Sequence, residues 1–266
     1  MRLLVVLSLV TITVPLPAQQ SPAPVERRTT ALHPMRYLVS RPQCWKAGES
    51  YPVVLAVTDG DREFEKTARA FMTARGNRPW VIVVPEVLTG GSPLRYSPSK
   101  RGAAYDYAPN IWYRAFMTTD CAFDVAGMTA LVLDVRRLDS PSGKFYLTGW
   151  EAGGHVVWAQ YFRHPATWTA VATISPNYIS RCMEDRKFAT PADSGPPVRL
   201  FYRAKDTAGA PGGVLYTQWL AVKRIAVRQG FAHLSERSVA ARPRGPMPQE
   251  VLAWFDSLRA AGSGRH

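Results

Sequence analysis

The sequence has no apolar run long enough to cross a membrane, which takes about 20 consecutive apolar residues. Its most apolar stretch, Leu3–Val14, follows Met1-Arg2 and ends at Pro15-Leu16-Pro17-Ala18. A short apolar run with a basic start and a small residue at its end is typical of a secretory signal peptide. We therefore expect residues 1–18 to be removed near Ala18. The mature protein is expected to be secreted or periplasmic and not membrane-spanning.

Clustered basic charge is also missing. The formal net charge is +13, from 33 Lys and Arg against 20 Asp and Glu, yet the densest basic runs are pairs such as Arg27-Arg28 and Arg136-Arg137. A nucleic-acid site needs a basic stripe or a recognised module, so no specific nucleic-acid partner is expected. No group of ligand-type side chains has the spacing of a metal site. We expect neither a metal nor a cofactor.

Short apolar runs alternate with helical patterns along most of the chain. Strands that alternate with helices predict an α/β fold, with a mostly parallel central sheet and helices on both faces. The expected strands are Met35–Ser40 (antiparallel), Tyr51–Val57, Trp80–Pro85, Lys144–Leu147, Trp168–Ile174, Val198–Tyr202 and Phe231–Val239. The expected helices are Asp61–Arg75, Asp120–Leu138, one from about Gly153, Val214–Gln229 (closed by Gly230) and Pro248–Ala260.

A chain of 266 residues fits one sizeable domain. We expect that domain to span residues 31–261. The preceding residues 19–30, rich in Pro, Gln and Arg, are expected to be a flexible lead-in, and residues 262–266 a tail.

A sharp turn follows the strand expected at Lys144–Leu147. It reads Gly149-Trp150-Glu151-Ala152-Gly153 and runs into a helical pattern that includes His155. A strand, a glycine-pinched turn and a helix are the context of a nucleophile elbow, G-x-S-x-G, in which the glycines let strand and helix approach. Every part of the motif is present except the serine, and Glu151 stands in its place.

On these residues the sequence resembles the α/β-hydrolase superfamily, and within it the secreted polyhydroxybutyrate depolymerase and feruloyl esterase-like proteins. The resemblance is a pattern of elements from about Met35 to Leu258. It implies an α/β-hydrolase fold with a nucleophile, an acid, a base and an oxyanion hole. The acid is implied just after the strand Val198–Tyr202, where Asp206 is found. Asp206 is equally well explained as an ordinary turn residue.

Histidine, of which the chain has five, is absent from the loop where the resemblance implies the base. Relatives often carry Gly-His just before the final helix, and this chain has Pro243-Arg244-Gly245 there, so Arg244 aligns with the base. Serine and histidine touch in an active hydrolase. Glu151 and Arg244 are therefore expected to face each other as an ion pair that holds the site shut.

The implied oxyanion hole would use the backbone N–H of Ala152 and one from the loop Asp59-Gly60, where relatives carry His-Gly. Asp59 places a carboxylate beside a site meant to hold an anion, which opposes its stabilisation. Aspartate serves as nucleophile in the haloalkane dehalogenase branch, but glutamate is one methylene longer. Arginine stays protonated and cannot act as the base. Neither ester hydrolysis nor alkyl transfer has a complete set of residues.

We therefore expect a protein of esterase ancestry with a degenerate triad, one that binds without catalysing a reaction. Its ligand would be a small molecule, an ester- or glycan-containing polymer, or another protein. The alternative is a carboxylic-ester hydrolase with an atypical site centred on Glu151. Two further possibilities are a degenerate paralogue, and an unrelated α/β protein in which Glu151 is a solvated loop charge.

Three cysteines leave at least one without an intramolecular partner. Cys44 falls in a turn at the amino end of the expected sheet, whereas Cys121 and Cys182 fall on connections at its carboxyl rim. A disulfide needs Cα atoms within about 7 Å of each other. We expect Cys121–Cys182 as the bond, with Cys44 free. The alternative is that all three are small buried apolar residues.

Overall fold

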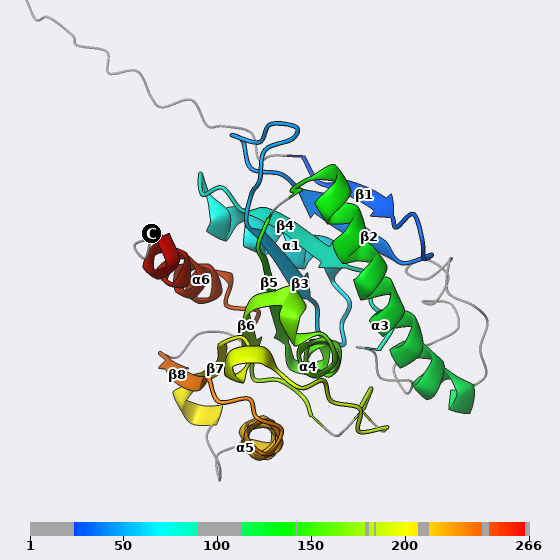
Figure 1. Cartoon of the computed structure of the whole chain (residues 1–266), viewed down its shortest axis with the longest axis vertical. Helices are drawn as coiled ribbons and strands as arrows, with labels where there is room; N and C mark the ends of the chain where they lie inside the picture. The colour runs from blue at the N-terminus through cyan, green and yellow to red at the C-terminus, as the bar shows by residue number, and fades with distance from the viewer. Residues whose placement is uncertain are drawn as a thin grey trace, which may run out of the picture.

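The structure is a computed structural model and describes residues 24–89, 113–141, 143–178, 181–183, 185–206, 213–240 and 245–263, without the side chains of residues 113–120 and 263. The signal peptide expected at residues 1–18 therefore lies outside the described residues, and so does Arg244. The described residues form one sheet with helices on both faces (Figure 1).

The sheet has eight strands in the order β1-β2-β4-β3-β5-β6-β7-β8. The first two, β1 and β2, make antiparallel pairs (β1 with β2, β2 with β4), and all the other pairs are parallel. The strands are β1 (Glu26–Thr29), β2 (Arg36–Ser40), β3 (Val53–Val57), β4 (Val81–Pro85), β5 (Phe145–Trp150), β6 (Trp168–Ile174), β7 (Val198–Arg203) and β8 (Leu234–Val239). The α/β architecture predicted from the sequence is confirmed.

Helices cover both faces of the sheet, which is why β3 and β4 are apolar at every position. On one face α1 (Phe64–Arg75) and α6 (Pro248–Ser263) pack on a core that includes Val54 and Tyr146. On the other, α3 (Tyr113–Leu138), α4 (Gly154–Arg163) and α5 (Gly213–Arg228) enclose a core around Trp158. Short 3-10 turns lie at η2 (Glu151–Gly153), η3 (Pro165–Thr167), η4 (Ala192–Ser194) and η5 (Ala204–Asp206).

The last part of the expected flexible lead-in is a strand instead, so that prediction was wrong for β1. The Arg27 side chain pairs with the buried Glu86 carboxylate (2.7 Å), and Arg28 pairs with the buried Asp139 (2.9 Å). Arg41, just beyond β2, also binds Asp139 (2.8 Å). The arginines of this segment suggested that it is solvated. Instead, buried acids that lie far away in the sequence pair with them and hold β1 at the edge of the sheet.

Two helices begin at other residues than the sequence pattern predicts. The first, α1, starts at Phe64, so Asp61 lies in the preceding turn and does not cap the helix. The second, α3, starts at Tyr113, seven residues before the expected Asp120. The end of α5 agrees with expectation, since Gly230 has φ 85° and the Phe231 N–H bonds back to the Ala226 carbonyl.

Candidate functional site

The candidate site lies at the carboxyl ends of neighbouring parallel strands, where α/β sheets carry their ligands. The turn after β5 holds Glu151, the first residue of η2, in a left-handed conformation with φ 44°. A residue other than glycine in this region is strained and marks a functional turn in many proteins. The strand, turn and helix of a nucleophile elbow are therefore present, with a carboxylate side chain at the centre.

Two glycines make this turn possible. A Cβ on Gly149 would lie 2.5 Å from Val157 Cγ2 of α4, and a Cβ on Gly153 would lie 2.4 Å from the Thr58 carbonyl oxygen. Real Cβ atoms do not approach backbone oxygens this closely. The elbow therefore packs directly against the end of β3, which brings Thr58 and its neighbour Asp59 to the Glu151 turn.

Asp59 is a buried carboxyl group at this end of β3, only 6% exposed. Burial is the main reason that its pKa is raised to about 6, and the charges of Asp61 and Glu151 raise it further. The Asp61 N–H donates to Asp59 Oδ1 at 3.1 Å. Asp59 and Glu151 thus share one electrostatic environment. An oxyanion that developed between Asp59 and Glu151 would be destabilised by their negative charge, since neither residue supplies positive charge.

Asp206, at the implied acid position, is held by an arginine. Arg203, the last residue of β7, donates from Nε to Asp206 Oδ2 and from Nη2 to Asp206 Oδ1, both at 2.7 Å. Both side chains are largely buried. The pKa of Arg203 is raised, chiefly by its hydrogen bond to Asp206 and also by the charge of Glu151. Arg203 is therefore a cation that binds Asp206 and is influenced by the charge of Glu151, and it was not among the residues predicted from the sequence.

One signal in the sequence could have found Arg203. It follows the expected strand Val198–Tyr202 directly and stands three residues before Asp206, a spacing at which opposite charges meet in a helical turn. The turn exists as η5. Both oxygens of the Asp206 carboxylate already accept a hydrogen bond from this guanidinium, which fixes the orientation of the acid.

Ser175 is the hydroxyl beside these acids. It follows β6, has φ 40°, and lies with Oγ 3.5 Å from Asp206 Oδ2. Next to it, the Asn177 N–H donates to the Glu151 carbonyl at 2.8 Å. A serine nucleophile needs a strong base nearby. The carboxyl group nearest to Ser175 is that of Asp206, and both of its oxygens already accept hydrogen bonds from Arg203.

The four histidines in the described part of the chain have other surroundings, and none hydrogen-bonds to Glu151 or Asp206. His33 packs on Phe123, and His164 lies just after α4. His233 precedes β8, at the amino end of the sheet, and contacts the Asp193 carbonyl. His155 is buried in α4, and burial together with the charge of Arg181 lowers its pKa to about 4.

The remaining residues predicted for the site are those of the oxyanion hole and Arg244. Ala152 is the middle residue of η2, and Asp59-Gly60 follow β3, so the two strand ends implied for the oxyanion hole are adjacent. The predicted contact between Glu151 and Arg244 involves a residue outside the described ones and stays a prediction.

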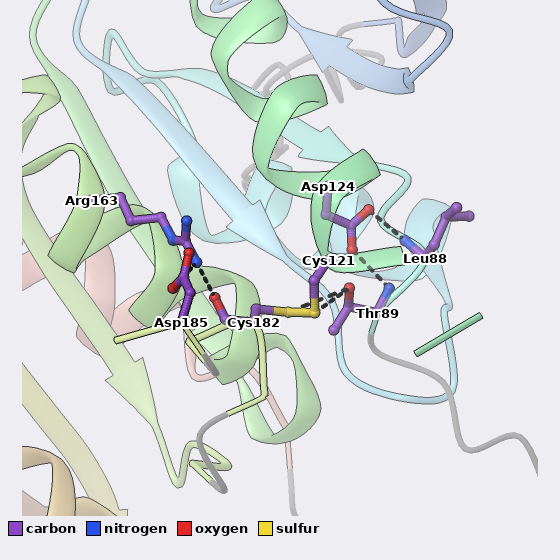
Figure 2. The surroundings of a disulfide bond; sticks show 7 residues. All are labelled: Leu88, Thr89, Cys121, Asp124, Arg163, Cys182 and Asp185. Atoms are coloured by element: carbon purple, nitrogen blue, oxygen red, sulfur yellow. Dashed lines mark hydrogen bonds and ion pairs between the residues drawn. A yellow bond between two sulfur atoms is a disulfide. The ribbon is translucent and has the colours of Figure 1, made fainter. Parts of the chain in front are cut away.

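The structure has a disulfide between Cys121 and Cys182, the pair expected from the sequence, while Cys44 is an exposed free thiol. Figure 2 shows the bond between the amino-terminal part of α3 and the connection that follows β6. Among the described residues no group of three or more His, Cys, Asp or Glu side chains could hold a metal ion. No helix in the described ranges is long and apolar enough to span a membrane.

Comparison with known proteins identifies the fold. No family model and no curated protein sequence matches the chain. A solved structure from Klebsiella pneumoniae assigned as a dienelactone hydrolase is 16% identical, with a TM-score of 0.55 over 90% of this chain and 98% of that chain. The siderophore hydrolase EstA from Aspergillus nidulans is also 16% identical, with a TM-score of 0.54 over 96% and 100%. Esterase 2 from Thermogutta terrifontis is 13% identical, with a TM-score of 0.53 over 90% and 91%. The protein has the α/β-hydrolase fold.

Proposed function

We propose that this chain is a secreted protein of esterase ancestry that binds a ligand at the inherited site and does not hydrolyse it. Its ancestors would be the polyhydroxybutyrate depolymerase and feruloyl esterase-like proteins, with Glu151 in place of the serine. The ligand would be a small ester, an ester- or glycan-containing polymer, or another protein.

The observation that carries this proposal is the ion pair between Arg203 and Asp206. In a hydrolase the acid holds the histidine in its catalytic orientation. Here both oxygens of the acid accept hydrogen bonds from one guanidinium at 2.7 Å. The residue at the acid position is therefore bound to a group that cannot accept a proton.

The elbow residue supports the same conclusion. A carboxylate that attacks an ester forms an anhydride through an intermediate that expels the carboxylate more readily than the alkoxide. Asp59 adds a second acid where the oxyanion should be stabilised; its pKa is raised chiefly by burial, and the charge of Glu151 adds to the shift. Among the described residues, a reaction at Glu151 thus has no base, no suitable nucleophile and no favourable oxyanion site.

A second candidate is an ester hydrolase with an atypical site centred on Glu151. It is favoured by the strained backbone of Glu151 and by the hydrolases and esterases among the similar structures. A protein that had lost all use for the turn would not need to keep a strained residue there.

Turnover of short p-nitrophenyl esters separates the two candidates. We expect no turnover above buffer for the wild-type protein between pH 5 and 9, and no change in Glu151→Ala. Turnover that Glu151→Ala abolishes would establish the hydrolase. Turnover that survives Glu151→Ala would reject both, and Ser175→Ala is the next variant to assay in that case.

A further inference from the structure

The Cys121–Cys182 disulfide is buried, and it joins α3 to the connection after β6, which contacts the Glu151 turn through Asn177. Cys121 lies in α3 and Cys182 on the connection after β6, at a sequence separation of 61. The Thr89 hydroxyl lies 3.9 Å from the sulfur of Cys121 and 3.8 Å from that of Cys182 (Figure 2). Three segments therefore meet at this bond: α3, the connection after β6 and the connection after β4.

Asp124, one turn along α3, holds the connection after β4 in the same place. Its Oδ1 accepts the Leu88 N–H at 2.8 Å, and its Oδ2 accepts the Thr89 N–H at 2.7 Å. The side chain is fully buried. Hydrogen bonds from backbone N–H groups to a carboxylate are among the stronger ones in proteins. The two hydrogen bonds form only while α3 keeps its position, and the disulfide holds that part of α3 in place.

The connection after β6 leads from the disulfide to the elbow. Arg163 of α4 donates to the Cys182 carbonyl (2.9 Å) and pairs with Asp185 (2.8 Å). Five residues before Cys182, the Asn177 N–H holds the Glu151 carbonyl at 2.8 Å. A Cβ on Gly154 would lie 2.8 Å from the Asn177 carbonyl oxygen. The position of Asn177 therefore helps to set the geometry of the Glu151 turn.

Both cysteines belong to the main apolar core, in the same cluster as Met128, Leu131 and Val135 of α3. The connections after β4 and β6, however, are irregular segments that lie outside the strands of the sheet. Such connections open locally at a lower free energy than the central strands of the same protein. Loss of the disulfide should thus loosen the connections after β4 and β6, which we call the rim of the site, and leave the sheet folded.

We propose that oxidation of Cys121 and Cys182 completes the Glu151 site, so that the reduced chain folds with the rim of the site open. This inference concerns the site assigned under the proposed function, but it does not depend on whether that site is catalytic. In the oxidation the two thiols lose two protons and two electrons and form the S–S bond. A disulfide-exchange oxidant accepts them and is itself reduced to two thiols. A chain kept in a reducing compartment would carry an incomplete site.

Hydrogen exchange of the full chain tests this directly, with Cys121→Ser/Cys182→Ser compared against wild type and against the matched Cys44→Ser variant. In the double variant we expect exchange to be about tenfold faster or more in peptides that contain Asn177, Cys182 and Leu88 to Thr89. Exchange in β3, β7 and α6 should match the wild type. The Cys44→Ser variant should match it everywhere.

Two results would overturn the inference. One is unchanged exchange around Asn177 and Thr89 in the double variant, which would mean that the bond does not hold the rim. The other is loss of protection throughout the sheet, which would make the bond a requirement of the whole fold. Ester turnover, measured on the same samples, reports on the proposed function separately.

Discussion

At the scale of single residues, the site consists of one ion pair and of two acids whose charges act on each other. Arg203 binds Asp206 through two hydrogen bonds, and the Glu151 charge acts on both Arg203 and Asp59. A catalytic triad needs groups poised to exchange a proton, whereas a guanidinium bound to a carboxylate has none to exchange. On the proposed function, these residues stabilise the binding site and take no part in a reaction.

The first prediction concerns Arg203→Met. The change leaves the buried Asp206 carboxylate without its partner, so we expect the free energy of unfolding to fall by about 2 to 3 kcal/mol. Urea denaturation measures this. Arg224→Met is the matched control, since Arg224 is exposed on α5 and has no acidic partner among the described residues. Equal stability of the two variants would show that the ion pair does not matter for the fold.

The second prediction concerns the pH dependence that Asp59 contributes. Its folded-state pKa is raised to about 6 from an ordinary 3.8, chiefly by burial. The folded protein therefore binds this proton more tightly than the unfolded chain does. The stability that Asp59 contributes is fully present below about pH 4 and is lost as the pH rises through 6, by about 2 to 3 kcal/mol at most.

Asp59→Asn should remove this loss, so the variant becomes more stable relative to wild type as the pH rises from 4 to 7. Urea denaturation at several pH values measures the difference. Burial also raises the pKa of Asp124 to about 6, so the same trend from Asp124 remains in both proteins and cancels in the comparison. An identical pH slope in wild type and variant would contradict the prediction.

At the scale of elements, the elbow depends on how closely its backbone approaches β3. Gly153 is the point of contact, since a Cβ there would lie 2.4 Å from the Thr58 carbonyl oxygen and 2.9 Å from that of Val57. Both obstacles are backbone atoms of a central strand end. They cannot rotate away as a side chain could.

The third prediction is that Gly153→Ala destabilises the protein by at least about 2 kcal/mol, because the strand or the turn must shift. Gly262→Ala is the control. Gly262 lies in α6 with open space around its Cβ position, and alanine there should raise stability by about 0.5 to 1 kcal/mol. Thermal denaturation of the two variants measures both effects. A tolerated Gly153→Ala would show that the elbow is less tightly packed than described.

Much of the fold was predictable from the sequence, because the inner strands are buried on both faces and appear as continuous apolar runs such as Val81–Pro85. The elbow was predictable because its glycines stand at fixed positions around Glu151. By contrast β1 was not, since its arginines are neutralised by Glu86 and Asp139, acids that lie far away in the sequence. The pairing of Arg203 with Asp206 was predictable from their spacing of three residues, whereas the effect of the Glu151 charge on Arg203 depends on the turn after β5, which lies far away in the sequence.

At the scale of the whole molecule, the α/β-hydrolase fold determines which residues make up the candidate site. The fold brings the ends of β3, β5, β6 and β7 to one edge of the sheet, and Asp59, Glu151, Ser175 and Asp206 follow those strands in that order. The fold itself does not imply an activity, which depends on the residues at those ends. On our account these residues form a binding site without a nucleophile.

A reactive p-nitrophenyl phosphonate tests that claim most directly, because it bonds covalently to an activated nucleophile and releases p-nitrophenol. The intact mass of the wild-type protein should stay unchanged after prolonged incubation, while an active serine esterase treated in parallel gains one phosphonyl group. An adduct located by peptide mapping at Glu151 or Ser175 would show that the site still holds an activated nucleophile, and would contradict the account.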